Sequence, residues 1–143
     1  MIKRIITSCT VIKQNMVRLF ERMLDDIDED VSNDLNGYYS MDYNKINNCI
    51  CYTYDMDEYQ TILPHLFSLE WLSSTKSMSS TIKSSIPIES GVINRLERIS
   101  DIEIEYEYEN DGLYTLCVTH PFHLNSIVLM VMSEITKYEI VLN

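Results

Sequence analysis

The segment from Asp101 to His120, DIEIEYEYENDGLYTLCVTH, constrains the fold more than any other part of the chain. Glutamate stands at every second position from 103 to 109, and apolar or aromatic residues fill the positions between. Since successive residues of a strand point to opposite faces of a sheet, this alternation predicts a strand with one apolar and one acidic face. The Asn-Asp-Gly sequence that follows predicts a turn into a second, antiparallel strand.

Two turns are compatible with this hairpin, and they pair different faces. A two-residue Asp-Gly turn would set the glutamates opposite apolar side chains. A three-residue loop at 110–112, with Gly112 in the left-handed region, instead places Tyr108 opposite Tyr114 and leaves one wholly apolar face. The glutamates then share the reverse face with Thr115, Cys117 and Thr119. We predict this second register, with helices on the apolar side and solvent on the acidic side.

The rest of the chain switches between helical and strand periods. The predicted elements are a strand at 2–7, a helix from 12, a hairpin at 37–55 with a loop at 44–47, helices from 57 and from 89, a segment at 124–137 and a final strand at 138–142. The acidic run at 25–30 should end the first helix, because carboxylates destabilise the C-terminal end of a helix. We predict that 124–137 is helical, although the short apolar run at 127–132 is also compatible with a buried strand.

Helix, hairpin and helix occur twice in this order, which is typical of an α+β, ferredoxin-like α/β sandwich. The sandwich is either one enlarged copy or two βαββα-type halves that share a sheet. We predict one compact domain over residues 1–143, with antiparallel hairpins and helices on one face. The Ser/Thr-rich segment 73–85 is predicted to be a mobile linker between halves 1–72 and 86–143, in which Thr81 and Ile82 would add a short strand.

Residues 84–112, SSIPIESGVINRLERISDIEIEYEYENDG, carry a family resemblance. A stretch of small residues and proline leads to a short helix and then to an acidic-aromatic strand. In this pattern the segment resembles the ferredoxin-fold domain of plasmid and phage proteins of the YubB/Api92-like type. The resemblance implies an accessory protein of a mobile genetic element, with no established catalytic residues.

The charge of the chain limits its partners. It has 22 acidic side chains against 11 lysines and arginines, a net charge of −11. Nucleic acids and anionic membranes attract clustered basic residues, so both are disfavoured as direct partners. The longest apolar run, at 127–132, falls far short of the roughly 20 residues of a spanning helix. Polar residues also interrupt the N-terminal segment where a signal peptide is apolar. We therefore predict a cytoplasmic protein.

Four cysteines in a cytoplasmic chain that can build its own core are predicted to be free thiols. Cys49 and Cys51 should share one face of a strand, where Cys117 would join them if the two hairpins are neighbours. Cys117 also stands near His120 and His123, and thiolate with imidazole suits zinc. The spacing of these three residues matches no known metal motif, and no fourth strong ligand stands nearby. We expect no metal and no cofactor.

The sequence also offers little that resembles catalysis. Residues 25–37 lack the glycine and glutamate of an EF-hand calcium loop. The glutamates stand about 7 Å apart on one exposed strand face with no evident pocket-forming residues beside them, which does not favour an acid/base pair. We therefore expect a protein without catalytic residues.

The predicted function is a small acidic, non-enzymatic module that binds a basic protein surface, with DNA mimicry as a narrower version. It would serve as a phage or plasmid accessory or inhibitor protein. The predicted binding residues are Glu103, Glu105, Glu107, Glu109 and Thr115. One alternative is an enzyme, or a binder of a small ligand or metal, around Cys117, His120 and His123. Another is a self-assembling structural protein that uses edge strands at 1–7 or 138–143.

Overall fold

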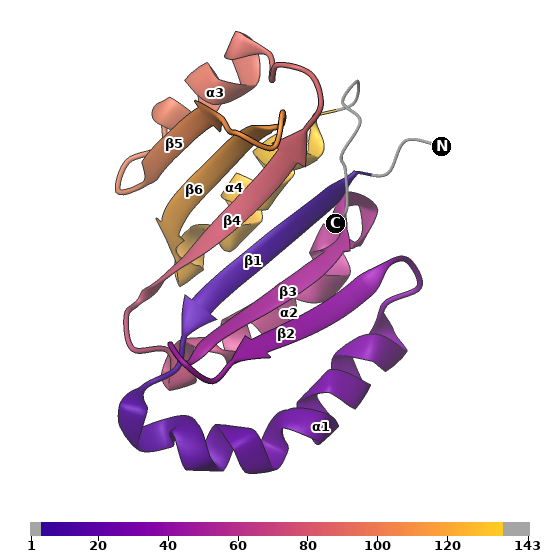
Figure 1. Cartoon of the computed structure of the whole chain (residues 1–143), viewed down its shortest axis with the longest axis vertical. Helices are drawn as coiled ribbons and strands as arrows, with labels where there is room; N and C mark the ends of the chain where they lie inside the picture. The colour runs from indigo at the N-terminus through magenta and orange to yellow at the C-terminus, as the bar shows by residue number, and fades with distance from the viewer. Residues whose placement is uncertain (1–3, 136–143) are drawn as a thin grey trace.

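A computed structural model describes residues 4–135, in which six antiparallel strands form one sheet in the order β2-β3-β1-β4-β6-β5 (Figure 1). The strands are β1 Ile5–Val11, β2 Tyr39–Asn44, β3 Cys49–Asp55, β4 Ser77–Ser84, β5 Glu103–Tyr108 and β6 Tyr114–Pro121. The helices are α1 Val17–Asp34, α2 Tyr59–Ser68, α3 Ser90–Glu97 and α4 Asn125–Ser133. Four short 3-10 turns connect them: η1 Gln14–Met16, η2 Met56–Glu58, η3 Glu70–Leu72 and η4 Phe122–Leu124.

The chain is built from two halves of the same design. The succession β1-α1-β2-β3-α2 is repeated as β4-α3-β5-β6-α4. In each half the first strand pairs with the third, and the second strand lies at the edge of the sheet. The halves join where β1 and β4 pair antiparallel, with Ser8 opposite Ser80. The predicted α+β, ferredoxin-like sandwich with two βαββα-type halves sharing a sheet is confirmed.

The Ser/Thr-rich segment predicted to be a mobile linker is instead β4, one of the two central strands. Its alternate residues Met78, Ser80, Ile82 and Ser84 are buried, and the strand pairs with both β1 and β6. The linker prediction is therefore wrong over 77–84, and the second half begins at β4. Serine and threonine are small enough to be enclosed in a sheet core when neighbouring hydroxyls satisfy them, and composition alone does not reveal this.

Helices pack on one face of the sheet, where α2 and α4 lie behind the strands in Figure 1 and contact each other. The core between the layers includes Ile50, Tyr52 and Tyr54 of β3 and Leu116 and Val118 of β6, all essentially inaccessible to solvent. The other face carries small polar side chains and cysteines of intermediate exposure in its central strands. This confirms that the helices cover one face.

Helix α1 continues through the acidic run that was predicted to end it. Val31 is fully buried beyond the run. Tyr39 donates a hydrogen bond to Asp28 at 2.9 Å, and Asp34 lies 2.8 Å from His65. Tertiary packing and these partners offset the unfavourable interaction of the carboxylates with the helix dipole.

The first hairpin has the predicted faces but a shifted loop. Met41 shares a face with Ile50, as predicted, and lies opposite Tyr52. The four-residue loop runs from 45 to 48, because Asn44 pairs with Cys49. The Asn44 side chain accepts from the backbone N–H of Ile46 at 2.9 Å, and Asn48 takes a φ of 57°. Asparagine tolerates this left-handed geometry, which allows the loop to sit one residue later.

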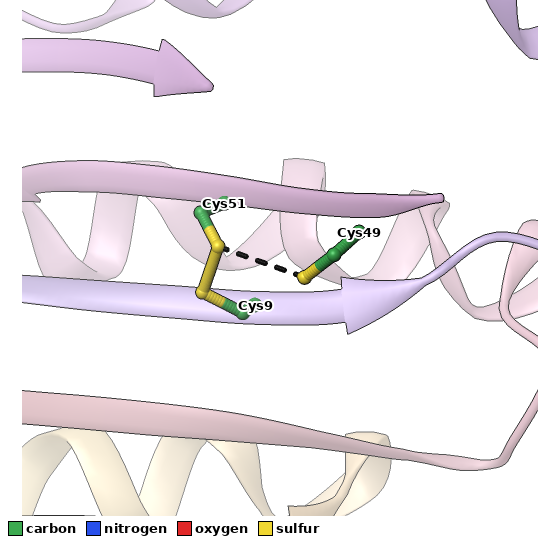
Figure 2. A group of neighbouring side chains, drawn as sticks. All are labelled: Cys9, Cys49 and Cys51. Atoms are coloured by element: carbon green, nitrogen blue, oxygen red, sulfur yellow. Dashed lines mark hydrogen bonds between the residues drawn. A yellow bond between two sulfur atoms is a disulfide. The ribbon is translucent and has the colours of Figure 1, made fainter. Parts of the chain in front are cut away.

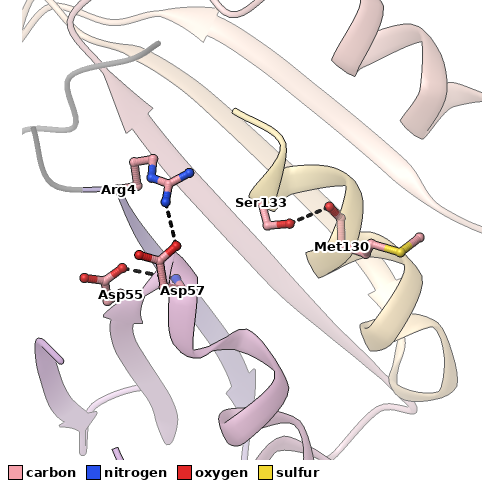
Figure 3. Close-up of polar contacts among 5 residues, drawn as sticks. All are labelled: Arg4, Asp55, Asp57, Met130 and Ser133. Carbon is pink, nitrogen blue, oxygen red and sulfur yellow. Dashed lines mark hydrogen bonds and ion pairs between the residues drawn. The ribbon is translucent and has the colours of Figure 1, made fainter. Parts of the chain in front are cut away.

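Polar contacts fix the junction between β3 and α2 (Figure 3). Asp55 accepts a hydrogen bond from the backbone N–H of Asp57 at 3.1 Å, and Arg4 forms an ion pair with Asp57. Asp55 is therefore the side chain that caps η2. At the end of α4, the Ser133 hydroxyl donates to the carbonyl oxygen of Met130 at 2.7 Å.

The helical prediction is confirmed for 127–132, which lies within α4. Strand β1 extends to Val11, further than the predicted 2–7. The predicted final strand at 138–142 lies outside the described residues. Between residues 4 and 135, no helix is both long enough and apolar enough to cross a membrane.

Candidate acidic interaction surface

The hairpin of β5 and β6 has the predicted register. Tyr108 pairs with Tyr114, and their ring centroids lie 4.8 Å apart. The loop at 110–112 closes with Gly112 at a φ of 82°. The backbone N–H of Glu109 donates to the carbonyl of Leu113 at 2.9 Å. This register turns the alternate glutamates away from the helices.

Four glutamates, Glu103, Glu105, Glu107 and Glu109, form what we call the acidic stripe. Glu103, Glu105 and Glu107 are exposed, and they lie opposite the small side chains of Thr119, Cys117 and Thr115. The described part of the chain gives none of these three an ion pair. Because β5 is the last strand of the sheet, the stripe follows a sheet edge.

A lysine sits at one end of the acidic stripe. Lys83 Nζ, on β4, lies 3.8 Å from a carboxylate oxygen of Glu109 and 3.6 Å from one of Asp111. Beside them, residues 107–111 line a shallow pocket of about 410 Å³. The negative charge is therefore partly neutralised at the Glu109 end and uncompensated toward Glu103.

Thr115 contributes no accessible hydroxyl to this surface. Its Oγ1 is covered and has no hydrogen-bond partner among the described residues. Lys83 and Glu107 flank it on the neighbouring strands. The residue belongs to the acidic face, as predicted, but its hydroxyl is enclosed by the protein.

Three cysteines cluster on the same open face, away from the stripe (Figure 2). Cys9 of β1 lies opposite Cys51 of β3, and a disulfide joins them. The Cys49 sulfur lies 3.8 Å from that of Cys51. Burial, together with the negative charge of Asp42, raises the pKa of the Cys49 thiol.

The prediction of four free thiols is therefore wrong for Cys9 and Cys51. The neighbour of Cys49 and Cys51 is Cys9 and not Cys117, because β1 pairs with β3 while β6 lies beyond β4. Spacing along the chain could not reveal this, since Cys9 and Cys51 are 42 residues apart and meet only through the strand order.

The predicted metal or ligand group of Cys117, His120 and His123 is not assembled. Cys117 lies on the open face, half-buried, whereas His120 is fully buried on the face covered by helices. His123 is exposed in η4. Because residues an odd number of positions apart on a strand point to opposite faces, Cys117 and His120 cannot share an ion.

His120 instead ends a chain of buried polar groups that crosses four strands. Tyr54 Oη lies 2.8 Å from Ser8 Oγ, which is 3.3 Å from Ser80 Oγ. Ser80 Oγ is 3.0 Å from Nε2 of His120, and Nδ1 is 3.0 Å from the carbonyl oxygen of Pro121. Burial lowers the pKa of His120 and raises that of Tyr54. The network was not predicted from the sequence, although small polar residues at buried strand positions are its signal.

Two large aromatic side chains near the end of α2 are partly exposed. The exposed fraction is 38% for Phe67 and 50% for Trp71. With Lys13 and Lys76 they line an open pocket of about 500 Å³. Lys13 Nζ donates to the carbonyl oxygen of Trp71 at 3.0 Å. The helix α2 ends at Ser68, so Trp71 falls in η3, outside the helical periodicity.

Comparison with known proteins identifies no family for this chain. No protein-family description matches, and no curated protein does. Similar solved structures include a putative C-terminal regulatory domain of aspartate kinase from Porphyromonas gingivalis W83, with 18% identity, 94% of each chain covered and a TM-score of 0.34. Another is E. coli aspartokinase III in complex with lysine and aspartate, with 14% identity, 96% of this chain and 32% of that chain covered, and a TM-score of 0.32. At these TM-scores the comparisons assign neither an activity nor a ligand.

Proposed function

We propose that this chain is a non-enzymatic interaction module whose acidic stripe binds a basic protein surface. The observation that carries the proposal is the row of exposed Glu103, Glu105 and Glu107, which have no basic partner among residues 4–135. Keeping like charges together on one strand contributes no cohesion to the fold, since neighbouring carboxylates repel one another. A binding role gives this arrangement a function.

The position of the stripe favours a particular kind of partner. Successive glutamates on one face stand about 7 Å apart, which is also the spacing of alternate residues on an extended segment. A segment with lysine or arginine at every second position would match the stripe. Beyond β5 the described chain supplies no further strand, so such a segment would also find backbone groups free to pair.

The net charge of −11 would add long-range attraction to these contacts. Electrostatic complementarity accelerates encounter and orients the partners more than it strengthens the final complex. A narrower version of the proposal is DNA mimicry, in which the carboxylates occupy the nucleic-acid channel of a basic protein. In either version the chain would act in the cytoplasm as a phage or plasmid accessory or inhibitor protein.

A binding experiment with charge-matched variants tests the proposal. The probe is an immobilised extended peptide with lysine at alternate positions. The stripe variant replaces all four glutamates by glutamine. The control replaces four exposed acids of α1 by their amides, namely Asp25, Asp26, Glu29 and Asp30. Asp28 is left intact because it accepts the Tyr39 hydrogen bond.

The stripe variant should associate about tenfold more slowly, and its association should depend less on salt concentration. The control should keep most of the wild-type rate. Equal slowing of the two variants would assign the effect to net charge and refute a role for the stripe. The self-assembly alternative cannot use β1 as an edge, because β3 and β4 pair with it on both sides. It predicts instead an oligomer in sedimentation experiments at low protein concentration.

A further inference from the structure

The cluster of Cys9, Cys49 and Cys51 has the composition of a metal site. Within the described residues, it is the one group of three or more histidine, cysteine or carboxylate side chains whose ligand atoms lie within 4.8 Å of one another. Two adjacent strands supply it. Cys9 lies directly opposite Cys51, and Cys49 precedes Cys51 by two residues on the same face.

The spacing of the sulfur atoms fits a single ion. Metal–thiolate bonds of about 2.3 Å place the sulfurs of a three-coordinate site about 4 Å apart. Cys49 Sγ and Cys51 Sγ are already 3.8 Å apart. Since the disulfide occupies Cys9 and Cys51, it must open before their sulfurs can bind a metal. All three side chains are half-buried on the open face, where an ion can enter.

The donor set selects the metal. All three donors are sulfur, which favours soft ions such as monovalent copper over magnesium or calcium. Structural zinc takes four ligands in almost every case, and residues 4–135 add no fourth strong ligand to this cluster. The cross-strand neighbours of the cysteines are Asp42, Asn44, Val11 and Ser79, so none is basic. The carboxylate of Asp42 adds a charge that favours a cation.

We propose that the reduced protein binds one monovalent copper ion through the three thiolates, and that the Cys9–Cys51 disulfide abolishes the site. An external disulfide closes it: its own S–S bond breaks, the Cys9–Cys51 bond forms, and two electrons with two protons pass to the external sulfurs. A dithiol reductant reverses the step. The ion and the disulfide therefore exclude each other, because both require the same two sulfurs.

Titration of the fully reduced chain, freed of reductant under nitrogen, tests this proposal. Monovalent copper is supplied as its bicinchoninate complex, whose colour reports transfer to the protein. We expect one ion per chain, and X-ray absorption should show three sulfur neighbours at about 2.3 Å. The variants Cys49→Ser and Cys9→Ser should weaken binding by about tenfold or more, since even the loss of an outer-shell partner costs that much.

The chain supplies its own control in Cys117, a half-buried thiol on the same face that belongs to no such cluster within the described part of the chain. Cys117→Ser should keep wild-type affinity. The oxidised protein, with its disulfide verified by mass spectrometry, should lose the site. Cys49→Ser keeps Cys9 and Cys51, so this variant can still form the disulfide. Circular dichroism can establish that it folds. Three results would each overturn the proposal. They are equal weakening of copper binding by Cys117→Ser, full copper binding by the oxidised protein, and four-coordinate zinc binding in preference to copper.

Discussion

Ser80 Oγ lies 3.0 Å from Nε2 of His120, and this contact joins β4 to β6 beneath the helices. The same serine hydroxyl is 3.3 Å from Ser8 on β1, across the junction of the two halves. His120 is fully buried, and burial lowers its pKa. The serine hydroxyl that contacts the other half therefore also contacts a buried imidazole whose pKa is lowered.

Acidification should weaken the fold through His120. In the unfolded chain its pKa is about 6.5, whereas in the folded chain it is lower. The contribution of the neutral imidazole is fully present above pH 6.5 and is lost as the pH falls toward the folded-state pKa, because only the unfolded chain binds the proton there. The free energy of unfolding should fall by up to about 1.4 kcal/mol per pH unit.

Denaturant titrations between pH 7 and pH 5 measure this dependence. His120→Gln removes the titrating group and should flatten the slope. The control His123→Gln changes an exposed residue and should leave the slope as in the wild type. A slope that survives in His120→Gln would mean that other groups cause the pH dependence.

Gly112 should resist substitution for reasons of backbone geometry alone. Its φ of 82° is strained for any residue with a Cβ. Space is not the obstacle, because the nearest atom to an added Cβ would be Tyr108 Oη at 4.0 Å. Gly112→Ala should therefore lower the free energy of unfolding by about 1 kcal/mol. Gly91→Ala makes the same change in open space on α3 and should be neutral or stabilising. Urea denaturation of both variants measures whether the free energy of unfolding falls only in Gly112→Ala.

The features that the sequence predicted well rest on local alternation. The register of Tyr108 with Tyr114 follows from one apolar face and one glycine, and both faces of the first hairpin follow from the same period. The errors arose where contacts with residues distant in the sequence determine the structure. β4 is polar in sequence, and its burial depends on hydrogen-bond partners, the hydroxyl of Ser8 and the imidazole of His120. Likewise, only the strand order brings Cys9 to Cys51.

The disulfide should stabilise the chain substantially when it is present. Cys9 and Cys51 are 42 residues apart, and closing a loop of that length removes unfolded-state entropy worth about 4 kcal/mol. Reduction should lower the free energy of unfolding by about 2–4 kcal/mol. Guanidinium denaturation with and without a reductant measures the change. Cys9→Ser should show no further response to the reductant, whereas Cys117→Ser should respond like the wild type.

Replacing Lys83 should strengthen binding of the alternating-lysine peptide, whereas replacing the stripe glutamates should weaken it. Its ammonium lies within 4 Å of carboxylate oxygens of Glu109 and Asp111, so it screens the end of the acidic stripe. Lys83→Gln should increase the association rate of the alternating-lysine peptide a few-fold and steepen its salt dependence. The free energy of unfolding should change by less than about 1 kcal/mol, because exposed ion pairs contribute little.

Lys45→Gln supplies the matched control for Lys83→Gln. Lys45 is exposed in the loop between β2 and β3, and β2 is the edge strand opposite to β5. Both variants make the net charge of the chain more negative by one. At about 0.1 M salt the field of a single charge is screened over about 10 Å, so a charge at the far edge should scarcely affect the stripe. Faster association of Lys83→Gln alone would locate the encounter at β5, whereas equal acceleration would show that the peptide responds only to net charge.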